Sequence, residues 1–267
     1  MRGRFLIRFI VGIVVASEAT AHDLWLVPPE TGQLGTKIRV RVISGDKFPT
    51  GGSAPDPSLF KSRTGREPSS KLFEVDSAGK DESAGLLQFQ PTKAGIYAIG
   101  IQTKPKILTM GAEKFNDYLI EDGLLHIYRL RAKERSLGEG AQEQYSKSPK
   151  AIFQIGADDT GDPCQPLDLT LEIVPLQNPF KCKVGDALKV QVLFEGKLLA
   201  GAHLGWDHPG DGEEIAGTTI ADKSGHALIP LAKSGLMTIR LTHMTRPKNA
   251  KYEWESFWTT LTFHVPK

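Results

Sequence analysis

Short segments in which apolar and polar residues alternate constrain the fold of this 267-residue chain more than any other feature. Within residues 37–44, Ile38, Val40 and Val42 fall on one face and charged residues on the other. A period of two is typical of an antiparallel β-strand with one buried face. Other short segments of this kind, bounded by residues that favour turns, occupy residues 71–75, 86–90, 95–103 and 151–155. The first half is therefore predicted to consist of β-strands.

The second half of the chain repeats this plan. Three pairs of segments correspond, namely 35–43 with 185–193, 89–101 with 228–242, and the predicted turns 76–79 with 222–225. Such a repeat predicts two copies of one supersecondary unit. Short alternating strands separated by Gly and Pro turns are typical of β-sandwiches. We therefore predict a mainly β protein with two immunoglobulin-like sandwiches in tandem.

One stretch between the two repeats has a helical pattern instead. Phe115, Tyr118 and Leu119 recur at helical spacing, Gly123 is suited to cap the helix end, and residues 124–135 continue as a second, basic helix with a solvated face. The predicted boundaries are an N-terminal domain at 22–157 with its helical segment at 112–135, a linker at 158–166, and a C-terminal domain at 167–267.

The first twenty-one residues have the pattern of a secretory signal peptide. A head with three arginines precedes a short apolar run, and Ala19-Thr20-Ala21 has the small-x-small pattern of a cleavage site. Cleavage after Ala21 makes His22 the first residue of the mature chain, which we expect to be periplasmic or secreted. Cleavage after Ala19 would leave Thr20-Ala21-His22, an amino-terminal sequence that also binds Cu(II) or Ni(II).

The composition argues against several classes of partner. Removal of residues 1–21 takes away three arginines and one glutamate, so the mature chain has 30 basic and 30 acidic residues. A balanced charge without a basic run gives no electrostatic reason to bind nucleic acid or anionic lipid. No later segment has the apolar length of a membrane span, so the mature chain is expected to be soluble.

The two cysteines, Cys164 and Cys182, are expected to form a disulfide because the chain is predicted to be exported. In the chain-entropy model such a loop is worth about 3 kcal/mol. Free thiols are the alternative. A metal or redox pair is a weak interpretation, because the spacing is long and the chain has no CxxC motif.

Histidines are the main candidates for a functional role, because the chain has no GxSxG, Walker or HExxH motif. The protein is therefore not expected to be an enzyme. At His22, the α-amine and the imidazole of one residue can together chelate a metal ion, although His22 is alternatively part of an unstructured tail. His243 ends an alternating strand on its inner face, where it is either a buried polar residue or a metal ligand.

The remaining histidines and the tryptophans have structural interpretations. His126, His203, His208, His226 and His264 are expected on surfaces, turns or a helix face. The four tryptophans could line a sugar-binding face, but packing is the commoner role of tryptophans in sandwiches. They are Trp25, Trp206, Trp254 and Trp258.

Several motifs together resemble a bacterial family of exported proteins labelled a domain of unknown function. They are the AHDLWL sequence at 21–26, KFNDYL at 114–119 with EDG at 121–123, YSK at 145–147, FEGK at 194–197, THM at 242–244 and WTTLTF at 258–263. Members of the family are often described as the periplasmic component of nickel or cobalt uptake systems. The resemblance implies a secreted, two-part β protein that handles such an ion, with His22 and His243 at positions where a metal role is reasonable.

From these observations we expect an exported, non-enzymatic protein that binds a divalent transition metal ion, namely Ni, Co or Cu, and assists its uptake or delivery. The chain has no permease segment, so transport would need a membrane metal-uptake system as partner. The alternative is an immunoglobulin-like interaction or carbohydrate-binding module without a metal.

Overall fold

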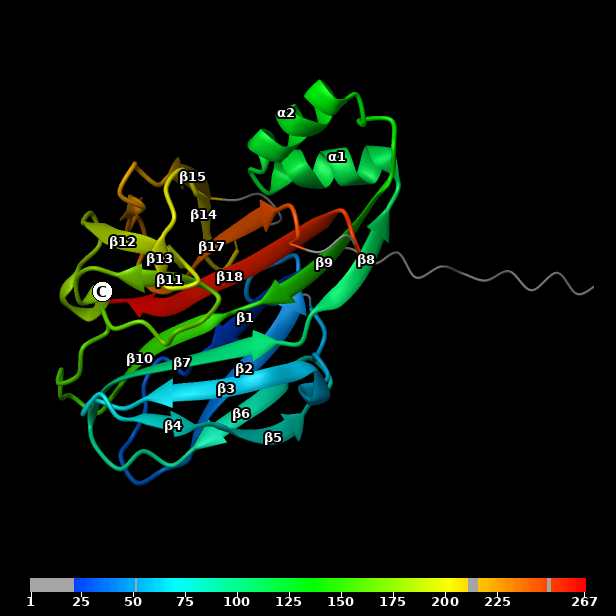
Figure 1. The fold of residues 1–267 in the computed structure, drawn as a ribbon. Helices are drawn as coiled ribbons and strands as arrows, with labels where there is room; N and C mark the ends of the chain where they lie inside the picture. Colours follow the sequence, from blue (N-terminus) through cyan, green and yellow to red (C-terminus); the bar gives the residue numbers. More distant parts are fainter. Residues whose placement is uncertain (1–21, 51, 211–215, 249–250) are drawn as a thin grey trace, which may run out of the picture.

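The computed structural model describes residues 22–50, 52–210, 216–248 and 251–267 (Figure 1). The predicted signal peptide lies outside these residues. Within them the chain is mainly β, as predicted, with two sandwiches and a helical hairpin. Among the described helices, none is long and apolar enough to cross a lipid bilayer.

The first sandwich packs a four-stranded sheet against strands of a larger one. The four-stranded sheet has the order β1 (Asp23–Val27), β2 (Ile38–Gly45), β6 (Gly85–Phe89), β5 (Asp76–Lys80). The facing strands are β3 (Phe60–Arg66), β4 (Leu72–Glu74), β7 (Gly95–Thr103) and β10 (Lys150–Ile155). The predicted inward residues Ile38, Val40 and Val42 are all buried in the core between them, so the alternation of β2 is confirmed.

The second sandwich has the same plan. Its smaller sheet contains β11 (Leu171–Pro175), β12 (Ala187–Phe194), β13 (Lys197–Leu198) and β16 (His226–Pro230). Its other sheet contains β14 (His203–Asp207), β15 (Gly217–Ile220), β17 (Gly235–Thr245) and β18 (Trp254–Val265). Met237, Ile239 and Leu241 of β17 are buried in its core, as their alternation predicts.

The two sandwiches share one continuous sheet of ten strands. It runs β15-β14-β17-β18-β10-β7-β3-β4, with the β8–β9 ribbon attached at β18. The strands of the two sandwiches meet in a short parallel pairing of β10 with β18, in which Lys150 lies opposite Leu261. The fully buried Lys150 Nζ lies 2.6 Å from Glu172 Oε1, and Glu172 also accepts hydrogen bonds from the backbone N–H groups of Leu167 and Leu169. A buried ion pair therefore holds the end of the linker between the halves.

A helical hairpin covers one end of the shared sheet (Figure 1). It comprises α1 (Ala112–Glu121) and α2 (Leu125–Glu134), and it lies between β8 (Lys106–Met110) and β9 (Ala141–Lys147). Phe115, Tyr118 and Leu119 of α1 are buried, as their spacing predicts. One residue of the basic helix departs from the prediction of a solvated face. Arg131 is buried, and its guanidinium donates hydrogen bonds to the carbonyls of Ser136 and Glu139.

Two other predictions are wrong. Asp76–Gly79 does not form a turn. It lies in β5, where an irregular register with β6 and the positive φ of Gly79 accommodate the turn-favouring residues at a sheet edge. Cys164 and Cys182 are both free thiols in the structure, so the predicted disulfide is not formed. Cys182 Sγ instead accepts a hydrogen bond from Gln177 Nε2 at 3.3 Å.

Candidate functional site

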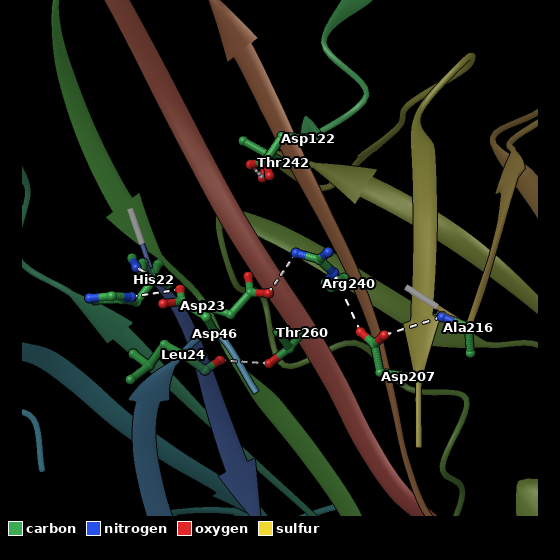
Figure 2. A network of polar contacts seen from close by, with 11 residues as sticks. His22, Asp23, Leu24, Asp46, Asp122, Asp207, Ala216, Arg240, Thr242 and Thr260 are labelled. Atoms are coloured by element: carbon green, nitrogen blue, oxygen red, sulfur yellow. Dashed lines mark hydrogen bonds and ion pairs between the residues drawn. The ribbon is translucent and has the colours of Figure 1, made fainter. Parts of the chain in front are cut away.

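A group of charged side chains gathers where β1, the helical hairpin and the second sandwich meet, and Arg240 of β17 lies at its centre (Figure 2). Arg240 Nη1 lies 2.8 Å from Asp23 Oδ2, and Arg240 Nε lies 3.5 Å from Asp207 Oδ2. All three side chains are largely buried. We call this group the charged junction. It also includes Asp122, Glu143, Lys147 and Thr242, which are described below. It joins the predicted start of the mature chain to the C-terminal sandwich.

The corner between α1 and α2 enters the same junction. Asp122 accepts a hydrogen bond from Thr242 Oγ1 at 2.7 Å. Burial, and after it the negative charge of Asp23, raises the pKa of Asp122 to about 7. Gly123 has φ +71°, and a Cβ atom there would lie 2.1 Å from Nδ1 of His203. The hairpin corner is therefore fitted closely against β14 and β17.

Strand β9 contributes a second buried carboxyl. Glu143 is 1% exposed, and its Oε2 accepts a hydrogen bond from the Tyr118 hydroxyl at 3.4 Å. Burial raises the pKa of Glu143 to about 7 and the pKa of Tyr118 well above its usual value. The Tyr118 ring stacks on Trp258 of β18 with 5.6 Å between ring centroids. Tyr118 of α1 therefore contacts both β9 and β18.

Lys147, at the end of β9, is a buried cation of the same junction. Its Nζ donates a hydrogen bond to the backbone carbonyl of His22 and lies 4.9 Å from the centroid of the Trp258 ring. Burial lowers the pKa of Lys147 to about 8, whereas the charges of Asp23 and Asp122 act in the other direction. Lys147 therefore fixes the backbone at His22.

The His22 side chain lies against the edge of the first sandwich. Asp23 pairs with Gly45, so His22, just before β1, and Asp46, just after β2, lie at the same end of the β1–β2 ladder. His22 Nδ1 lies 2.6 Å from Asp46 Oδ1 (Figure 2). Since the carbonyl and the ring of His22 both have partners, this residue is not a loose tail.

A sequence profile described as "Domain of unknown function (DUF4198)" matches residues 19–245. The chain belongs to this family. The matched region contains most of the charged junction, from Asp23 to Thr242. No curated protein matches the chain.

The DUF4198 chain also aligns with solved structures, at very low similarity. A mutant Salmonella alpha-2-macroglobulin matches with 8% identity and a TM-score of 0.24, over 91% of this chain and 15% of that one. The D00-D0 domain of intimin matches with 10% identity and a TM-score of 0.20, over 88% and 98% of the two chains. A segment of Escherichia coli alpha-2-macroglobulin matches with 7% identity and a TM-score of 0.21, over 87% and 94%. The chain thus spans only a small part of the first of these proteins.

In this DUF4198 protein the second predicted metal ligand does not meet the first. Arg240 and Thr242 of β17 point to Asp23 and Asp122, whereas His243 lies on the opposite face. The His243 ring packs edge-on against Phe194 at 4.6 Å between centroids. Burial, and after it the charge of His126, lowers the pKa of His243 to about 4. Since strand residues alternate between faces, the sheet separates His243 from His22.

The other aromatic and histidine predictions have mixed outcomes. His126 is exposed and His264 is half-buried, whereas His208 is buried and His203 lines the charged junction. All four tryptophans are buried, so none of them offers a ring face for sugar stacking. Their exposed fractions are 2% for Trp25, 8% for Trp206, 1% for Trp254 and 4% for Trp258.

Sequence reasoning missed the acidic and basic members of the junction, because residues from five elements cannot be assembled without the fold. A partial signal was present. Asp23, Asp122 and Lys147 all lie within the motifs that carry the family resemblance. Among the described residues, no group of three or more His, Cys, Asp or Glu side chains is placed to hold a metal ion.

Proposed function

We propose that this protein is an exported, non-enzymatic metal-binding protein whose metal site is its processed N-terminus. It would bind a divalent transition metal ion in the periplasm or outside the cell and assist the ion's uptake or delivery. The ion is cargo, and a membrane metal-uptake system would receive it.

The observation that carries this proposal is the 2.6 Å contact between His22 Nδ1 and Asp46 Oδ1. Nδ1 is the ring nitrogen nearer the backbone, so it can share a small chelate ring with an α-amine on the same residue. Cleavage after Ala21 would create that amine. Two nitrogen donors and one carboxylate oxygen suit borderline ions such as Ni(II), Co(II) and Cu(II).

The surroundings of His22 support the same proposal. Lys147 holds the carbonyl of His22, and Arg240 holds the side chain of Asp23, so the terminus is anchored before any ion arrives. An anchored chelate loses less conformational entropy on binding than a loose tail would. Asp46 takes the place of the predicted ligand His243, which lies on the far side of the sheet.

Isothermal titration of Ni(II), Co(II) and Cu(II) into protein that begins at His22 tests the proposal. We expect His22→Ala and Asp46→Asn to weaken binding, and a single alanine added before His22 to weaken it as well, because the primary amine is displaced. His264→Ala, at a half-buried histidine remote from the site, is the matched control. Equal binding by the mature protein, His22→Ala and the extended form would overturn the proposal.

A further inference from the structure

A small pocket with several lysines lies beside His22. Ten described residues line it, of which three are lysines and none is acidic. The lysines are Lys104 and Lys106, which are exposed near the start of β8, and Lys147, which is buried at the end of β9. Ser44, Thr103 and Tyr145 are further polar residues of the lining.

The pocket lies next to the His22–Asp46 pair, at the same end of the β1–β2 ladder. Leu24 and Ser44 both line the pocket and lie opposite each other in the ladder. His22 lies just before β1, two residues from Leu24, and Asp46 lies just after β2, two residues from Ser44. Lys147 connects the two places directly, since it lines the pocket and its Nζ binds the carbonyl of His22.

The chemistry of the lining indicates an anion with a carbon skeleton. An ammonium group has three N–H donors, so Lys147 retains donors beyond the one that binds His22. Leu24, Leu59 and Phe60 give the pocket an apolar wall, which suits carbon atoms better than inorganic phosphate. Asp56 lies near enough to Lys106 to interact with it, but its carboxylate already accepts a hydrogen bond from the Ser58 N–H at 2.9 Å.

We infer that this pocket binds a small organic anion with two or more carboxylates, and that the metal ion reaches His22 as a chelate of such an anion. One carboxylate would contact the lysines while the ion meets the donors of His22 and Asp46. This inference rests on the proposed function for the role of the ion, but the anion pocket is testable without any metal.

Citrate is the probe, titrated calorimetrically into metal-free protein that begins at His22, with inorganic phosphate as comparator. We expect citrate to bind and phosphate to bind more weakly. Lys104→Gln and Lys106→Gln should each weaken citrate about fivefold, the loss of one charged surface contact. Lys71→Gln, at an exposed lysine outside the pocket, should leave it unchanged. Absence of citrate binding, equal binding of phosphate, or indifference to both lysine substitutions would overturn the inference.

A second titration, with the preformed nickel–citrate complex, separates the two proposals. We expect the complex to bind more tightly than citrate alone, and His22→Ala to remove only that gain. If nickel binds but citrate does not, the proposed anion pocket is overturned and the proposed N-terminal metal site still stands. If citrate still binds but the His22→Ala substitution does not change the affinity for nickel, the N-terminal site is overturned. The delivery of the ion as a chelate is then overturned as well.

Discussion

Arg240 donates a hydrogen bond to Asp23 over 2.8 Å, and the two residues are 217 positions apart in the chain. The contact joins the start of β1 to the centre of β17, with Asp207 on the other side of the guanidinium. The predicted mature N-terminus is thus held by the C-terminal sandwich. Substitutions in either half of the chain should therefore affect His22.

Arg240→Met should destabilise the protein, because it leaves Asp23 and Asp207 largely buried without their cation. Removal of one partner from a buried ion pair costs about 3 kcal/mol or more. Urea denaturation monitored by tryptophan fluorescence would measure the change in the free energy of unfolding. Arg39→Met, at an exposed position of β2, is the control and should change it little. Equal stability of the two variants would show that the junction does not hold the terminus.

Asp122→Asn should remove part of the pH dependence of stability. The pKa of Asp122 is raised to about 7 in the folded protein, so the folded state binds more protons than the unfolded state. Its contribution to stability is therefore present below the unfolded pKa, about 4, and is lost as the pH rises through about 7.

Melting temperatures measured across this pH range would test that sign. Asparagine can still accept the hydrogen bond from Thr242, so we expect the variant to gain stability relative to the wild type as the pH rises. Glu121→Gln, at the exposed neighbouring position, is the control. A variant with the wild-type pH profile would contradict the assignment.

Gly123→Ala should destabilise the hairpin corner for two reasons. The residue has φ +71°, which disfavours any residue with a Cβ, and that Cβ would lie 2.1 Å from His203 Nδ1. We expect a loss of more than about 1 kcal/mol. His203→Ala in the same chain should restore part of it, and Gly138→Ala, whose Cβ would meet no atom within 4 Å, should not show the effect.

Lys150→Met should be among the most destabilising single changes. Lys150 and Glu172 are almost completely buried, so the substitution leaves a buried carboxylate without its ammonium and should cost about 3–5 kcal/mol. Calorimetric melting of the full chain would measure it. The exposed Lys181, paired with Asp159, provides the contrast, because Lys181→Met should shift the melting temperature only slightly. Similar shifts for both would show that the Lys150–Glu172 pair does not stabilise the junction of the sandwiches.

Local patterns in the sequence were sufficient for much of the fold. The alternation of Ile38, Val40 and Val42 predicted β2, and the spacing of Phe115, Tyr118 and Leu119 predicted α1, because each pattern reports which side of one element is buried. Where the local signal was ambiguous, the prediction was wrong. Asp76–Gly79 has the composition of a turn, but pairing with β6 makes it an edge strand.

The site depended on contacts that no local pattern contains. His22 was identifiable from the sequence because its predicted properties are those of a single residue at a cleavage site. Its neighbours Asp46 and Lys147, and the separation of His243 by the sheet, were decided by strand order and register. The parallel pairing of β10 with β18 likewise fuses the two sandwiches. Short-range periodicity records burial, whereas only the folded chain brings residues more than a hundred positions apart into one charged junction.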